Sequence, residues 1–154
     1  DRIKAINKII PECGISSDFI TGFCNETEQD HALTLSLMGL VKFNFSYMYY
    51  YSERPNTFAQ RKLQDNITID IKKRRLQEIV DLQRSHSLLN NKLYVGKNYQ
   101  VLIEGLSKKS KEDFYGRNDQ NSVVVFKKKQ ANIGEFVKVH ITSCTSATLI
   151  GEII

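Results

Sequence analysis

Two kinds of hydrophobic periodicity divide the chain into two parts. Up to residue 93, apolar side chains recur at helical spacing or in short strand-like runs; from residue 94 they alternate with polar ones in short segments. The first pattern predicts helices over residues 2–10, 28–41 and 69–93, and strands over residues 15–23 and 45–51. The second pattern predicts five short strands, over residues 99–104, 114–119, 122–126, 136–141 and 147–152.

The first part alternates helix and strand, which is the pattern of a parallel sheet. Its second strand, over residues 45–51, is largely apolar on both faces, as in a sheet that is covered on each side. Two such strands need cover for their faces and edges. We therefore expect residues 1–60 to be the last portion of a larger α/β domain, and we expect the uncovered surface to cause self-association. The helix over residues 28–41 is expected to bury Leu33, Leu37 and Leu40.

A charged loop follows the second predicted strand. Glu53 and Arg54 precede Pro55, which cannot donate to a strand ladder and therefore ends the strand. Ligands of α/β sheets and barrels bind at the carboxyl ends of the strands, so Arg54 is a candidate ligand-binding residue. The alternative interpretation is that Arg54 forms a surface ion pair with Glu53.

The five short strands of the second part predict a small antiparallel barrel, a shape that closes to avoid open edges. Barrels of this kind bind single-stranded or looped nucleic acid through a basic face with exposed aromatic rings, and Tyr115 is a candidate ring. The alternative is a structural barrel with lysines on its surface. The basic run over residues 72–75 splays around its helix, either in solvent or along a phosphate backbone.

Composition and charge narrow the possible functions. Residues 1–52 carry 4 basic and 6 acidic side chains, whereas residues 53–93 carry 9 and 5 and residues 94–154 carry 9 and 6, so the later part is suited to a polyanion. No apolar run reaches membrane-spanning length, so we expect no membrane partner. Because the three cysteines are far apart and odd in number, we also expect a cytoplasmic location. The cysteines are isolated and predict neither a metal site nor a disulfide framework: Cys13, Cys24 and Cys144.

Three segments resemble motifs of one enzyme family. Residues 18–28 (DFITGFCNETE) resemble the late strand-to-helix turn of radical SAM barrels, and residues 51–57 (YSERPNT) with Ala59 resemble the YSxRPGTxA signature of methylthiotransferases. Residues 116–126 and 145–152 resemble a TRAM domain. The order and spacing are similar to those of the MiaB-type methylthiotransferases, which modify adenosine beside the tRNA anticodon. The sequence departs from the family at Asn56, where glycine is usual, and at Cys24, where many relatives have proline.

The resemblance implies an α/β plus all-β protein. Residues 1–64 would be the end of a truncated parallel βα barrel, residues 65–93 a long linker helix, and residues 94–154 a five-stranded, OB-like TRAM barrel. It also implies tRNA, through its anticodon arm, as partner, and Gly22, Ser52 and Arg54 as residues near the cofactor or target nucleotide. The candidate RNA-binding residues are Lys108, Lys109, Arg117, Asn118, Lys127, Lys128 and Lys138.

Two hypotheses follow. In the first, the chain is the carboxy-terminal part of an enzyme that uses S-adenosylmethionine and two iron–sulfur clusters to add a methylthio group to isopentenylated adenosine. The chain alone would then bind tRNA without catalysis, because three scattered cysteines cannot hold a cluster. In the second, the chain is an RNA-binding adaptor module without chemistry of its own.

Overall fold

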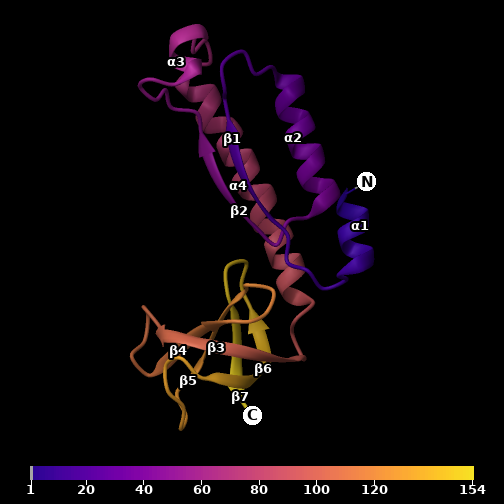
Figure 1. Ribbon diagram of the computed structural model, residues 1–154, viewed down its shortest axis with the longest axis vertical. Coiled ribbons are helices and arrows are strands. Elements are labelled where there is room, and N and C mark those ends of the chain that lie inside the picture. The colour runs from indigo at the N-terminus through magenta and orange to yellow at the C-terminus, as the bar shows by residue number, and fades with distance from the viewer. Residues whose placement is uncertain (1) are drawn as a thin grey trace. The chain divides into compact units, whose positions relative to one another are not determined.

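The structure, a computed structural model, describes residues 2–154 and separates them into two compact units. The βαβ unit comprises residues 15–85, and the barrel unit comprises residues 2–14 and 86–154. The βαβ unit contains β1 (Ser16–Thr21), α2 (Glu28–Val41), β2 (Phe45–Tyr50), α3 (Phe58–Lys62) and most of α4 (Ile69–Lys92). The barrel unit contains α1 (Arg2–Ile9), β3 (Asn98–Leu106), β4 (Asp113–Arg117), β5 (Val123–Lys127), β6 (Phe136–Cys144) and β7 (Leu149–Ile153) (Figure 1).

The two strands of the βαβ unit run parallel, as predicted, with α2 as the crossover between them. Ser16 pairs with Phe45 and Thr21 with Tyr50, so the two strands end side by side. The helices α2 and α4 pack on one face of this pair around a core of Phe19, Met38, Phe43 and Ile79. Residues 65–85, expected to belong to a linker, therefore fold with the strands.

The prediction that α2 buries its leucine row is wrong. Leu33, Leu37 and Leu40 are 62%, 48% and 77% exposed, whereas His31 and Met38 are buried. The two rows lie on opposite sides of the helix, because residues two apart are separated by about 200°. The inward row places Met38, Leu35 and Val41 against the core, and His31 Nε2 on the same side lies 2.7 Å from Glu78 Oε2 of α4.

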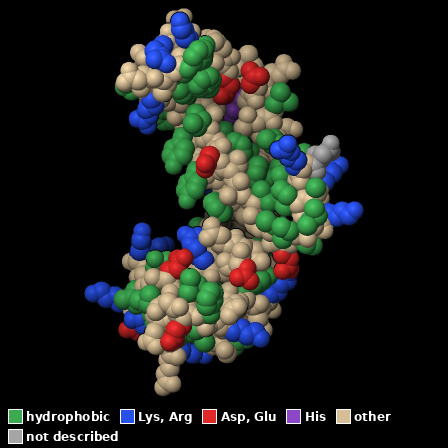
Figure 2. Space-filling view, viewed as in Figure 1, with side chains coloured by type: hydrophobic (Ala, Val, Ile, Leu, Met, Phe, Trp, Pro, Cys, Tyr) green, Lys and Arg blue, Asp and Glu red, His purple; other side chains and the backbone are tan. Residues whose placement is uncertain are grey.

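The other face of the parallel pair is open within the described residues. Ile20, Tyr47 and Tyr49 are 62%, 59% and 58% exposed, and Figure 2 shows apolar side chains open on the surface of this unit. Since Ile20 and Tyr49 are register partners, they form a continuous apolar surface across both strands. The expectation of a sheet covered on each side is thus met on one face only, and self-association remains a prediction.

The strands of the barrel unit form a closed barrel in the order β3-β4-β5-β7-β6. The prediction of five strands is confirmed, but the barrel is not wholly antiparallel, because β5 and β7 run parallel. Side chains alternate inward and outward along each strand. The inward ones form a core of Val101, Ile103, Phe114, Val124, Phe126, Val139, Ile141 and Leu149.

Two glycines allow the barrel to close. A Cβ atom at Gly116 would lie 2.0 Å from the carbonyl oxygen of Leu102, and one at Gly151 would lie 2.4 Å from that of His140. Both glycines are buried where neighbouring backbones approach closely, so no side chain fits there.

Within the described residues, no helix combines the length and apolarity required to cross a membrane.

Candidate nucleic-acid interface

Three outward side chains form an apolar row across the barrel wall. Tyr115 of β4 is the register partner of Val125 of β5, and Val125 is the partner of Ile150 of β7. All three point away from the core, because their neighbours in sequence are the buried core residues of the same strands. Ile150 is 41% exposed. The barrel therefore presents an apolar strip three strands wide at its surface.

This strip is the floor of a groove of about 520 Å³. The loop between β3 and β4 and the turn between β6 and β7 form its sides. A groove of this size accommodates a nucleotide-sized ligand. Its lining consists of Ser107, Lys108, Lys109, Asp113, Tyr115, Val123, Val125, Thr145, Thr148 and Ile150.

The position of the Tyr115 ring depends on the glycine opposite it. Gly105 of β3 is the register partner of Tyr115, and a Cβ atom there would lie 3.0 Å from Tyr115 Cε1. The ring thus lies against the backbone of β3, where a larger residue would push it away. An aromatic ring held in this way offers a stacking surface for a nucleobase.

The rim of the groove is positively charged. Within residues 2–154, neither Lys108 nor Lys109 forms an ion pair. The carboxylate that also lines the groove, Asp113, lies 3.6 Å from Lys127 Nζ and is therefore partly neutralised. Two ammonium groups thus remain available for phosphate beside an apolar floor.

Arg117 and Asn118 build the turn between β4 and β5. Arg117 Nη1 donates to the carbonyl oxygen and to Oδ1 of Asn121 at 3.0 and 3.1 Å, and Arg117 Nε lies 3.4 Å from Glu104 Oε2. Asn118 is buried, and its Oδ1 accepts from the Ser122 N–H at 2.8 Å. Their visible contacts hold the turn in shape, and a role of either residue in RNA binding remains a prediction.

The structure brings only some of the predicted cations together. Lys108 and Lys109 line the groove with Tyr115, and Lys127 reaches its edge through Asp113. Lys128 Nζ lies 5.5 Å from the centre of the Phe114 ring, and exposed Lys138 is on β6, outside the groove lining. Sequence reasoning missed Val125, Thr145, Thr148 and Ile150. The run over residues 123–126 is apolar throughout, so the sequence does not show that Val125 points outward, nor that β5 pairs with β7.

The strand ends of the βαβ unit carry the other predicted site residues. Gly22 follows β1 with a φ of 71°, and Ser52 and Arg54 are exposed after β2. Within residues 2–154 the Arg54 guanidinium has no ion-pair partner, so the alternative pair with Glu53 is not formed. Asn56 has a φ of 64°, the left-handed conformation that asparagine tolerates, so it can replace glycine in this turn.

The cysteines do not form a cluster site. Cys13 is exposed, Cys24 is buried and Cys144 is half-buried, and all three are free thiols. Nowhere in the described part of the chain do three His, Cys, Asp or Glu side chains converge as metal ligands. Iron–sulfur clusters require several convergent thiolates, so these residues do not fit such a group.

Burial, together with the neighbouring Cys24 thiol, raises the pKa of Tyr51, which stays a neutral phenol at pH 7.

Comparisons with known proteins point to one family. Residues 92–154 match the TRAM domain. The "tRNA-2-methylthio-N(6)-dimethylallyladenosine synthase" of Karelsulcia muelleri is 54% identical over 99% of this chain and 34% of its own length. The protein of the same name from Christiangramia forsetii is 59% identical over 97% of this chain, and the one from Flavobacterium johnsoniae is 56% identical over 99% of it. In both cases the match covers 31% of the length of the relative. The chain thus spans about a third of the length of these relatives.

Proposed function

We propose that the chain is the TRAM-containing part of a MiaB-type tRNA methylthiotransferase, because it is similar to such enzymes over 97–99% of its length, and that it captures tRNA for methylthiolation. The observation that carries the proposal is the groove on the TRAM barrel. An unpaired base stacks on Tyr115 over the strip formed with Val125 and Ile150. The adjoining phosphates contact Lys108 and Lys109, whose charges are not used within the described residues.

The complete protein, on this proposal, adds a methylthio group to isopentenylated adenosine beside the anticodon, in the cytoplasm. S-adenosylmethionine and two iron–sulfur clusters supply the radical chemistry when bound. The residues described here do not fit the clusters. Arg54, with its free guanidinium at the strand ends, suits a carboxylate or phosphate of the cofactor or the target nucleotide. Replacing Arg54 by alanine in the complete enzyme lowers modification without unfolding the protein.

A second candidate function is an RNA-binding adaptor without chemistry. It is favoured by one observation, namely that every residue lining the groove lies between Ser107 and Ile150 of the barrel unit. The two functions differ in what the complete protein does. Methylthiolation of tRNA by the complete protein supports the first function, and its absence supports the second.

The proposal is tested by titrating the whole 154-residue chain with an anticodon-arm RNA at several salt concentrations. The double variant Lys108→Ala/Lys109→Ala is compared with Lys4→Ala/Lys8→Ala, which removes the same charge from α1, outside the groove lining. Losing two phosphate contacts lowers the slope of log affinity against log salt by about 1.5. Unchanged affinity and slope in the groove variant would overturn the proposed interface.

A further inference from the structure

Two buried cations of α4 contact the ends of both parallel strands. Lys72 and Arg75 lie one turn apart on the helix and are 4% and 2% exposed, whereas Lys73 between them is exposed. The prediction that the basic run splays around the helix is therefore confirmed. Lys72 and Arg75 cannot contact a phosphate backbone, because both are buried in contacts within the βαβ unit itself.

Lys72 holds the end of β2. Its Nζ lies 2.7 and 2.6 Å from the two carboxylate oxygens of Asp65 and donates to the carbonyl oxygen of Tyr51 at 3.3 Å. The same ammonium group lies 5.1 Å from the centre of the Tyr51 ring. The side-chain stem of Lys72 packs on the backbone of Gly22, because a Cβ atom there would lie 2.5 Å from Lys72 Cγ.

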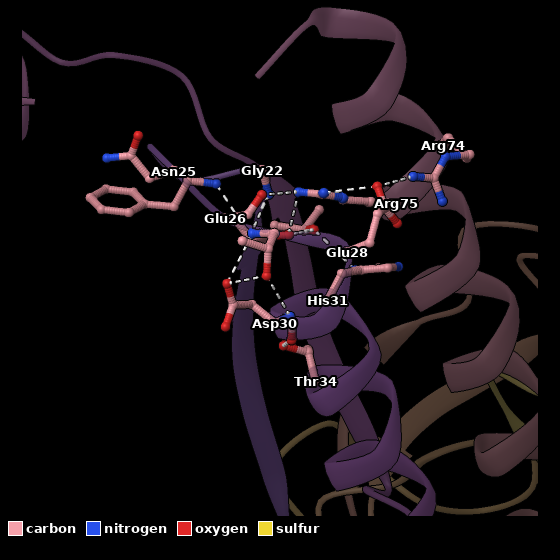
Figure 3. A network of polar contacts seen from close by, with 12 residues as sticks. Gly22, Asn25, Glu26, Glu28, Asp30, His31, Thr34, Arg74 and Arg75 are labelled. Atoms are coloured by element: carbon pink, nitrogen blue, oxygen red, sulfur yellow. Dashed lines mark hydrogen bonds and ion pairs between the residues drawn. The ribbon is translucent and has the colours of Figure 1, made fainter. Parts of the chain in front are cut away.

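Arg75 holds the turn after β1, as Figure 3 shows. Its Nη1 donates to the backbone oxygen and to Oε1 of Glu26 at 3.1 and 2.9 Å, and its Nη2 donates to Glu28 Oε1 at 2.9 Å. The second carboxylate oxygen of Glu26 accepts from the backbone N–H groups of Gly22 and Phe23 at 2.7 and 3.3 Å. Arg75 thus fixes the Gly22 turn through Glu26.

The stability of the unit alone does not explain why Lys72 and Arg75 contact these particular atoms. Well-packed apolar side chains can replace buried ion pairs with little loss of stability, so burial of two cations is not explained by the core. Both cations instead reach backbone or carboxylate atoms at the carboxyl ends of β1 and β2. This is the edge of a parallel sheet at which ligands bind, and it carries Gly22, Ser52 and Arg54.

We infer that Lys72 and Arg75 are positioning residues, which hold the Gly22 turn and the loop over residues 52–55 in the geometry that the reaction needs. The inference rests on the proposed function, since it concerns the same strand-end site. On this view α4 is a working part of the site rather than a connection to the barrel.

Amide hydrogen exchange on the whole 154-residue chain tests the geometric part of the inference. In Lys72→Met, the amides of residues 51–57 should exchange about tenfold faster, because the charge-assisted hydrogen bond from Lys72 to the Tyr51 carbonyl is lost. Lys73→Met is the matched control, with the same change at an exposed neighbour, and should leave this exchange unchanged. Equal exchange in the two variants overturns the inference.

A second variant separates positioning from stability. Lys72→Met leaves the Asp65 carboxylate unpaired and can unfold the unit, so Asp65→Asn is added to remove that charge. The double variant should regain the melting temperature of the unsubstituted chain but keep fast exchange over residues 51–57. Full recovery of both would show that the pair acts only on stability and would overturn the inference.

In the complete enzyme, Lys72→Met/Asp65→Asn should lower kcat for methylthiolation about tenfold or more while KM for tRNA stays unchanged, because the barrel groove is intact. An unchanged kcat overturns the positioning role. Absence of methylthiolation in the unsubstituted enzyme contradicts the proposed function instead, and the exchange experiment still decides the inference about Lys72.

Discussion

Tyr115 lies over Gly105, its register partner on β3, so closely that a Cβ atom at position 105 would be 3.0 Å from the ring. The relationship links a residue without a side chain to the one aromatic ring in the groove lining. Because the barrel core lies on the other side of the strands, a change at Gly105 alters the groove and leaves the core in place. The pair therefore allows the groove to be tested separately from the fold.

The variant Gly105→Val should weaken RNA binding. The branched side chain displaces the Tyr115 ring, and loss of one base–aromatic stack corresponds to about 1–3 kcal/mol, or roughly five-fold or more in affinity. Fluorescence anisotropy with a labelled anticodon-arm RNA measures the effect, and a denaturation curve checks that the barrel stays folded. An unaltered affinity would mean that the base does not use the Tyr115 ring.

Two substitutions on α2 test which side of the helix is buried. Met38→Ala should cost about 2–5 kcal/mol of unfolding free energy, because a fully buried side chain is lost from the core of the βαβ unit. Leu33→Ala, on the exposed row, should cost no more than about 0.5 kcal/mol. Urea denaturation of both variants measures the difference. Equal losses would contradict the orientation of α2 described here.

Acid should destabilise the βαβ unit. Burial alone would raise the pKa of Glu78, but the hydrogen bonds from His31 and Arg74 outweigh burial, and the pKa is lowered overall. A hydrogen bond from Arg75 likewise lowers the pKa of Glu28. A carboxyl whose folded-state pKa is depressed stabilises the fold above its unfolded-state pKa, and this stability is lost as the pH falls through the folded-state value. The loss should therefore begin near pH 4.5, the ordinary value for glutamate, and continue below it.

The variant Glu78→Gln provides the check on that pH dependence. It removes one of the depressed carboxyl groups, so the melting temperature of the variant should fall less steeply between about pH 5 and pH 3 than that of the unsubstituted chain. Thermal unfolding at a series of pH values gives both slopes. Parallel curves would show that Glu78 does not contribute to the acid sensitivity.

The sequence predicts strand order where strands are neighbours in the chain. The parallel pair β1–β2 follows from the alternation of helix and strand, and the outward position of Tyr115 follows from the period of two. The groove itself could not be predicted, because it depends on Ile150 lying beside Val125 through the pairing of β5 with β7. These strands are not consecutive, and local pattern carries no information on their contact.

Side-chain burial was the less predictable part of the βαβ unit. Both rows of α2 have helical spacing, and the buried row contains Leu35, Met38 and Val41 together with His31, which Glu78 of α4 pairs. In the same way, the run over residues 72–75 does not reveal that Lys72 and Arg75 are buried, since Asp65 and Glu26 reach them only in the folded chain. Partners from other elements thus decide which polar side chains are buried, and the pattern of one element does not show them.

The central claim, that a base of the RNA stacks in the barrel groove, is tested most directly by fluorescence. The chain contains no tryptophan, so the variant Tyr115→Trp carries a single reporter at the groove floor. Titration with the anticodon-arm RNA should quench its emission along the same curve as binding, whereas the matched variant Tyr47→Trp in the βαβ unit should not respond. Binding of the RNA without a change in the emission of Tyr115→Trp would contradict the account.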